Sequence, residues 1–196
     1  MVIGYRLYND TASPRQVSEA TRDLLIQLVR KYWLVSGPVH VTIDKTPSGA
    51  PLLSVNDQPV YCSLSHKSGF IAAAYSTNCS IGIDVENLRT SKNYQRIRDY
   101  YKDGFLTGSS LTKQAFFRQW TLAEAVAKAS GEPLLKVLEQ PLEKQQHAAR
   151  YFRLNSFLLC AYQAVTADKV SDISLYQLDS DNQWQYNTQI RLCSPV

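Results

Sequence analysis

The stretch Ile81-Gly82-Ile83-Asp84-Val85-Glu86 constrains the fold more than any other part of this chain. Its apolar residues alternate with Gly82, Asp84 and Glu86, and this period of two predicts a half-buried β-strand. Both carboxylates then leave the same face, close enough to share one hard cation, and Gly82 leaves open space beside them. The pattern therefore indicates a strand that carries two oxygen ligands for a metal ion.

A second feature, the segment from Lys113 to Ser130, has the clearest helical periodicity in the chain, and Gly131 closes it as a C-cap. Trp120, Glu124 and Lys128 follow one another at intervals of four residues, so they share one stripe of the helix. The helix thus places a third carboxylate and a lysine on a common face.

Each of these two patterns also has a common structural explanation. A D-x-E sequence is often the solvated face of an edge strand, and a glutamate four residues before a lysine is often a favourable surface pair. The residues leave both explanations open beside the metal-binding one.

Charge and composition exclude some classes of protein. The chain of 196 residues has 21 basic and 17 acidic residues, without a long Lys/Arg run, which argues against a nucleic-acid binder held mainly by charge. The small positive excess suits an anionic small molecule or an acidic protein partner.

The cysteines and the apolar runs bear on location. The four cysteines stand far apart without a C-x-x-C pair, so we do not expect a zinc site. We expect reduced thiols at Cys62, Cys79, Cys160 and Cys193. The N-terminus lacks a signal-peptide pattern, and the apolar runs are too short to cross a bilayer. The sequence therefore predicts a soluble cytoplasmic protein.

The first third of the chain offers candidate phosphate contacts. A helix is predicted from Arg15 to about Leu34, with Ser13 as N-cap, and the basic Arg30 near its end is either a solvated C-terminal cation or a phosphate contact. Strands are predicted at residues 60–64 and 70–75. Their connector, Ser65-His66-Lys67-Ser68-Gly69, carries hydroxyl, imidazole and amine donors for phosphate oxygens, although an ordinary hairpin turn explains it equally well.

A weak internal repeat suggests two related halves. Residues 3–8 and 81–86 both start Ile-Gly and alternate, and residues 70–75 and 157–162 share an F-x-x-x-A-Y pattern. Each half would run strand, helix, then paired strands. A duplication of this kind would place a ligand site between the halves.

Four motifs in order carry a family resemblance. They resemble the motifs of the 4'-phosphopantetheinyl transferases. In this chain they are Gly49-Ala50-Pro51, Ser63-Leu64-Ser65-His66-Lys67, Ile81 to Glu86, and Trp120-Thr121-Leu122-Ala123-Glu124 with Lys128. The chain most resembles the monomeric two-lobed group typified by surfactin-synthetase activators, rather than the shorter trimeric holo-acyl-carrier-protein synthases. The motifs cover about residues 49 to 128.

The resemblance implies a fold of two similar α+β lobes in one chain, a pseudo-dimer in which each lobe packs an antiparallel sheet on a long helix. The lobes would span residues 1–79 and 80–196, and the C-terminal lobe would carry the metal site at the cleft between them.

The resemblance also implies the site. Asp84, Glu86 and Glu124 would ligate Mg²⁺, and Glu124 would also accept the proton of the attacking serine. Coenzyme A phosphates would be held by a basic and hydroxyl-bearing set, namely Arg30, Lys45, Ser65, His66 and Lys128. Of these, Lys128 and His66 would stabilise charge during the reaction. Arg30 would contact the 3'-phosphate, and Lys45 or Lys67 would partly compensate for a missing cation.

Two positions depart from the family pattern: Ala50 and Ala123 stand where basic residues are usual. Loss of two exposed charge contacts should weaken nucleotide binding, by about 1 kcal/mol each.

The implied activity is transfer of 4'-phosphopantetheine from coenzyme A to a serine of an apo acyl or peptidyl carrier protein, with release of 3',5'-ADP. The enzyme would be a monomer that needs neither nucleic acid nor membrane. Two alternatives remain: a weakened paralogue that binds carrier protein or coenzyme A without transfer, and a metal-dependent hydrolase of nucleotide diphosphates.

Overall fold

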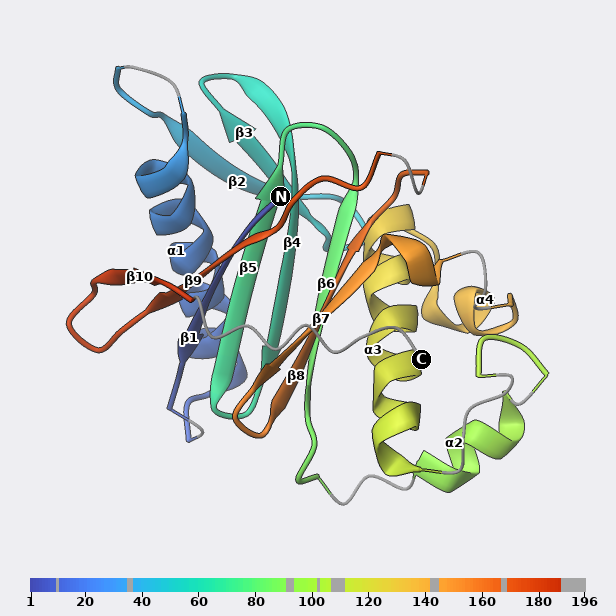
Figure 1. Cartoon of the computed structure of the whole chain (residues 1–196). Helices are drawn as coiled ribbons and strands as arrows, with labels where there is room; N and C mark the ends of the chain where they lie inside the picture. Colours follow the sequence, from blue (N-terminus) through green and yellow to red (C-terminus); the bar gives the residue numbers. More distant parts are fainter. Residues whose placement is uncertain are drawn as a thin grey trace. The chain divides into compact units, whose positions relative to one another are not determined.

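A computed structural model describes residues 1–9, 11–34, 37–90, 94–101, 103–106, 112–141, 145–166 and 169–187. The described chain is mixed α+β, as predicted, and forms two compact units (Figure 1). The first comprises Met1–Ile81 and the later segment Ser171–Gln189, and the second includes Gly82–Val170. None of the described helices is long and apolar enough to span a membrane.

The first unit is a seven-stranded sheet with one long helix. The helix α1 (Pro14–Tyr32) packs its buried leucines against the sheet, chiefly on β5. Ser13 caps it as predicted, because its side chain accepts a hydrogen bond from the backbone N–H of Gln16 while the Gln16 side chain accepts one from the Ser13 backbone. The strands, in sheet order, are β10 (Trp184–Tyr186), β9 (Ser174–Leu178), β1 (Val2–Leu7), β5 (Phe70–Ser76), β4 (Gln58–Lys67), β3 (Pro51–Val55) and β2 (Val41–Lys45).

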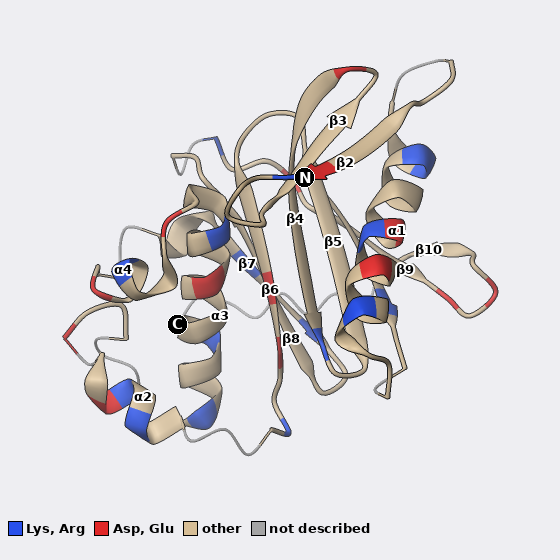
Figure 2. Cartoon of the chain, turned by 180° about the vertical axis from the view of Figure 1, so that it is seen from behind, with Lys and Arg blue, Asp and Glu red and all other residues tan. Residues whose placement is uncertain are grey.

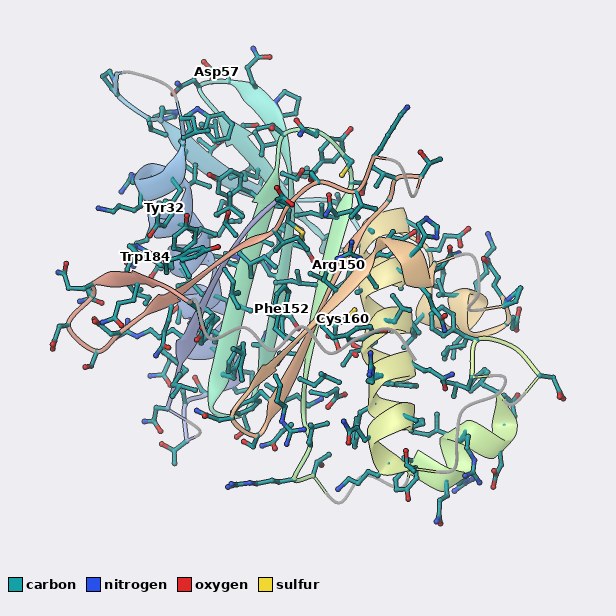
Figure 3. The ribbon with its side chains drawn as sticks, viewed as in Figure 1. Tyr32, Asp57, Arg150, Phe152, Cys160 and Trp184 are labelled. Atoms are coloured by element: carbon teal, nitrogen blue, oxygen red, sulfur yellow. The ribbon has the colours of Figure 1, made fainter. Side chains whose placement is uncertain are left out.

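The second unit is a three-stranded sheet covered by the helix α3. The sheet order is β6 (Ile81–Asn87), β8 (Phe157–Gln163), β7 (Ala149–Leu154). α3 (Lys113–Ser130) has the predicted bounds and ends at Gly131, which is left-handed at φ 72°. It packs on β8, where Figure 3 labels Cys160. The shorter helices are α2 (Tyr94–Tyr100), α4 (Leu134–Leu138) and the 3₁₀ turn η2 (Gln146–Ala148).

The structure corrects several expectations for the first unit. The sheet is mixed rather than antiparallel, because β1 pairs in parallel with β9. Strand β4 continues through Lys67, so the predicted 65–69 connector shrinks to a turn around Gly69 at φ 83°. Pro51 opens the strand β3, which the sequence patterns do not predict.

The C-terminal segment differs from the predicted organisation. Strands β9 and β10 join the sheet of the first unit, whereas the single boundary after residue 79 assigns them to the second lobe. Tyr32 of α1 lies edge-on against Trp184 of β10, with ring centroids 5.9 Å apart, and both are labelled in Figure 3. The Asn187 amide donates to the Tyr5 hydroxyl at 2.7 Å. These contacts attach the segment to the first unit.

The strand orders of the two units correspond in part. In the first unit β1 neighbours β5, which neighbours β4, and in the second β6 neighbours β8, which neighbours β7. The long helices α1 and α3 contact the central members β5 and β8. This order matches the weak sequence repeat, while the two-lobed pseudo-dimer and the lobe boundaries stay predictions.

Candidate metal centre

The strand β6 approaches the helix α3 backbone to backbone at Gly82. A Cβ atom at this position would overlap the carbonyl oxygen of Ala125 and lie 2.7 Å from its carbonyl carbon. We expected Gly82 to leave open space beside the carboxylates, and this expectation is wrong. The missing side chain instead lets the strand and the helix meet. Since Asp84 and Glu86 alternate from Gly82 on the same side of β6, this approach turns both carboxylates toward the helix.

Three carboxylates converge where β6 meets α3. Asp84, Glu86 and Glu124 each offer an oxygen atom, and these atoms lie within 4.8 Å of one another. Asp84 and Glu86 are only 4% and 1% exposed, so the explanation as a solvated edge-strand face is wrong. In Figure 2, acidic residues stand on both β6 and α3. The structure thus brings together the three predicted metal ligands.

Lys128 reaches from α3 to β6. Its ammonium group donates to Asp84 Oδ1 and to the backbone oxygen of Ile83, both at 2.9 Å. The Asp84 side chain is 5% exposed and that of Lys128 34%, so the ion pair links a buried carboxylate to a lysine at the surface. Lys128 is therefore more than the i, i+4 surface partner of Glu124.

Glu124 holds its proton unusually well. Its pKa rises from 4.5 to about 7, first because burial disfavours the charged form and next because the charge of Asp84 is close. A hydrogen bond to Asp84 and the charge of Glu86 raise the pKa further, whereas Lys128 lowers it. A carboxyl group with this pKa can accept or release a proton near neutral pH.

We expect this shift to appear as a pH dependence of stability. The pKa of Glu124 is higher in the folded than in the unfolded chain, so its contribution is full below pH 4.5 and is lost as the pH rises to about 7. Without divalent ions, the wild type should therefore lose more stability between pH 5 and pH 7.5 than Glu124→Gln, as measured by urea unfolding. Parallel curves for the two proteins would contradict the shift.

A buried layer next to the cluster escaped the sequence analysis. Cys160 of β8 is fully buried, and burial, followed by the charge of Asp84, raises the pKa of its thiol far above the usual range. The Tyr151 hydroxyl donates to the Arg118 backbone oxygen at 3.3 Å, and the Arg118 guanidinium lies 4.7 Å from the Tyr151 ring centre. The alternation of Leu158, Cys160 and Tyr162, which all contact the core of the second unit, is the sequence signal that could have revealed this face.

The remaining predicted site residues lie in the first unit. Ser65 is buried and His66 exposed, because successive residues of β4 point to opposite faces. Arg30 is exposed in the last turn of α1, and Lys45 is exposed at the end of β2. The part of these four residues in a common site with the carboxylates stays a prediction.

The two departures from the family pattern differ in their surroundings. Ala50 is exposed, whereas Ala123 has no exposed surface and belongs to the hydrophobic core under α3. We treated position 123 as an exposed charge contact, and its burial contradicts that interpretation. Only position 50 offers room for a cation at the surface.

The donor set fits a hard divalent cation. Three carboxylates without sulfur or imidazole suit Mg²⁺, which prefers oxygen ligands. Asp84 Oδ2 and Glu86 Oε2 are buried and accept no hydrogen bond from the described residues, although both side chains have other interactions. The residues present therefore suit the ion that the resemblance implies.

Comparison with known proteins supports the resemblance. No family model matches the chain. Over 129 residues it is 30% identical to a protein of Nostoc sp. named 4'-phosphopantetheinyl transferase HetI, and the match covers 61% of this chain and 54% of the relative. The chain thus matches about half the length of that protein. The similarity supports the resemblance to the phosphopantetheinyl transferase superfamily.

Proposed function

We propose that the protein transfers 4'-phosphopantetheine from coenzyme A to a serine of an apo acyl or peptidyl carrier protein, as a member of the monomeric two-lobed group acting in the cytoplasm. The observation that carries the proposal is the convergence of Asp84, Glu86 and Glu124 within 4.8 Å. The similarity to a named 4'-phosphopantetheinyl transferase supports it.

In this proposal the three carboxylates hold the ion that a diphosphate substrate needs. Mg²⁺, when bound, would neutralise the diphosphate, orient it and stabilise the leaving phosphate. Asp84 and Glu86 are buried and come from one strand, so they need little reordering to serve as ligands. Glu124 completes the set from the helix.

The transfer itself requires one proton acceptor. The serine oxygen forms a bond to the pantetheine-side phosphorus, the bond from that phosphorus to the bridging oxygen breaks, and 3',5'-ADP leaves. Glu124 would take the serine proton directly or through a water, since it is the one carboxylate of the three that is only partly buried. The phosphates of coenzyme A would be held by Arg30, Lys45, Ser65, His66 and Lys128. Of these, Lys128 and His66 would also stabilise the developing charge.

The direct test is incubation of the protein with coenzyme A, Mg²⁺ and an apo carrier protein, read by intact mass. A gain of one phosphopantetheine on the carrier, and none after chelation by EDTA, would support the proposal. Binding of carrier protein without a mass gain across a panel of carriers would favour a paralogue that does not transfer. Release of 3',5'-ADP without any carrier would favour a hydrolase.

The positions of the two alanines give a matched pair of variants. We expect Ala123→Lys to lower the free energy of unfolding by about 1–3 kcal/mol, because it adds a long charged side chain to a filled core. Ala50→Lys should leave stability within about 0.5 kcal/mol and tighten coenzyme A binding, because position 50 is exposed. Urea unfolding and calorimetry measure the two effects. Equal stability of both variants would contradict the burial of position 123.

A further inference from the structure

We propose that Lys128 is an internal counter-cation of the carboxylate cluster, which fixes Asp84 against α3 and competes with a divalent ion for the charge of that carboxylate. The inference rests on the proposed function only in taking this cluster as the metal site. It gives Lys128 a role inside the protein, in addition to any contact with substrate.

The hydrogen bonds of Lys128 support this role. Its ammonium binds both the Asp84 carboxylate and the Ile83 carbonyl, two successive residues of β6, at 2.9 Å each. A lysine that served substrate phosphates alone would need no such pair of bonds to the strand. The ammonium therefore attaches β6 to α3 at the level of the metal ligands.

The charges around Lys128 give it a second effect. Three carboxylates within 4.8 Å repel one another, and burial leaves little solvent to screen Asp84 and Glu86. Lys128 also follows Glu124 by one turn on the same face of α3, so its charge lies beside more than one member of the cluster. By the same attraction it reduces the negative charge that a divalent ion meets.

Removal of the lysine should change the stability of the metal-free protein and its affinity for a divalent ion in opposite directions. Without the ammonium, Asp84 loses a partner and β6 loses a link to α3, so the protein without divalent ions should become less stable. The cluster also becomes more negative, so a divalent ion should bind more tightly and restore more stability than it does in the wild type. A lysine that contacted only substrate would change neither quantity.

The experiment compares the wild type with Lys128→Met and Lys128→Arg, using Mn²⁺ as the probe. Free Mn²⁺ is measured by electron paramagnetic resonance at pH 8.5, and thermal unfolding is followed with EDTA and with Mn²⁺. We expect Lys128→Met to melt lower in EDTA and to bind Mn²⁺ at least about threefold more tightly, since one opposing charge is gone. Lys128→Arg keeps the charge and should resemble the wild type.

Equal or weaker Mn²⁺ binding by Lys128→Met would overturn the inference, as would an unchanged melting temperature in EDTA. A Lys128→Met protein that folds only with Mn²⁺ would support it, and one that stays unfolded with Mn²⁺ would contradict it. If the binding results hold and the carrier protein gains no mass, the transferase proposal fails alone. If carrier labelling occurs and Mn²⁺ binding is unchanged in the variant, only the inference fails.

Discussion

Replacing Gly82 with alanine is expected to lower the free energy of unfolding by about 3 kcal/mol or more, at the upper end of what overpacking costs. The reason is the contact of two backbones. A Cβ at position 82 would overlap the Ala125 carbonyl oxygen and lie 3.1 Å from the Ala129 backbone nitrogen. Neither atom can turn away as a side chain could, so β6 and α3 would have to separate. Urea or thermal unfolding measures the loss.

Gly4 is the matched control for this substitution. It follows an isoleucine in β1, as Gly82 does in β6, but a Cβ there would meet side-chain atoms of Trp184 and Leu28 at 2.7–2.9 Å. Side chains can shift, so Gly4→Ala should cost clearly less than Gly82→Ala. Separation of β6 from α3 should also weaken Mn²⁺ binding in Gly82→Ala alone. Wild-type stability of Gly82→Ala would refute the close approach.

Asp84→Asn is expected to reduce transfer to the carrier protein by at least about 10²-fold while the protein remains folded, as losing one preorganised electrostatic group commonly costs this much. Asparagine keeps the shape of the side chain but removes its charge. Because the charge of Asp84 raises the pKa of Glu124, the substitution should also lower that pKa. Intact-mass labelling measures the first effect, and an NMR titration of the Glu124 carboxyl carbon measures the second.

Asp103→Asn provides the control, because Asp103 is an exposed carboxylate of the same unit outside the cluster. It should label the carrier protein at the wild-type rate and leave the Glu124 titration unchanged. If Asp84→Asn transferred as fast as this control, Asp84 would have no part in the reaction. An unchanged Glu124 titration in Asp84→Asn would show that the two carboxyl groups are not coupled.

Local patterns located the two long helices but missed the strand β3. α3 has the predicted bounds because its N-cap, apolar stripe and C-terminal glycine all lie within one segment. The strand β3 was missed, since a proline at its start reads as a loop and its pairing partners β2 and β4 lie elsewhere in the chain. The strands β9 and β10 show the same limit, because only the pairing of β9 with β1, and of β10 with β9, reveals to which unit they belong.

The candidate site divides in the same way. Alternation in β6 and a four-residue spacing in α3 were enough to select Asp84, Glu86, Glu124 and Lys128 as candidates. They did not reveal that Gly82 is a contact point between backbones, that Asp84 and Glu86 are buried, or that Ala123 lies in the core. Each of these facts depends on which element lies opposite, and that is set by packing across distant parts of the chain.

The sequence by itself determined the residue types and periodicities: which carboxylates share a strand face, which residues share a helix face, and where α1 and α3 begin. Only the tertiary structure decided that these faces meet, with three carboxylate oxygens within 4.8 Å and Lys128 bonded to Asp84 across 44 positions of sequence. The physical reason is that periodicity is a property of neighbours in the chain. Burial, charge coupling and the raised pKa of Glu124 arise from neighbours in space.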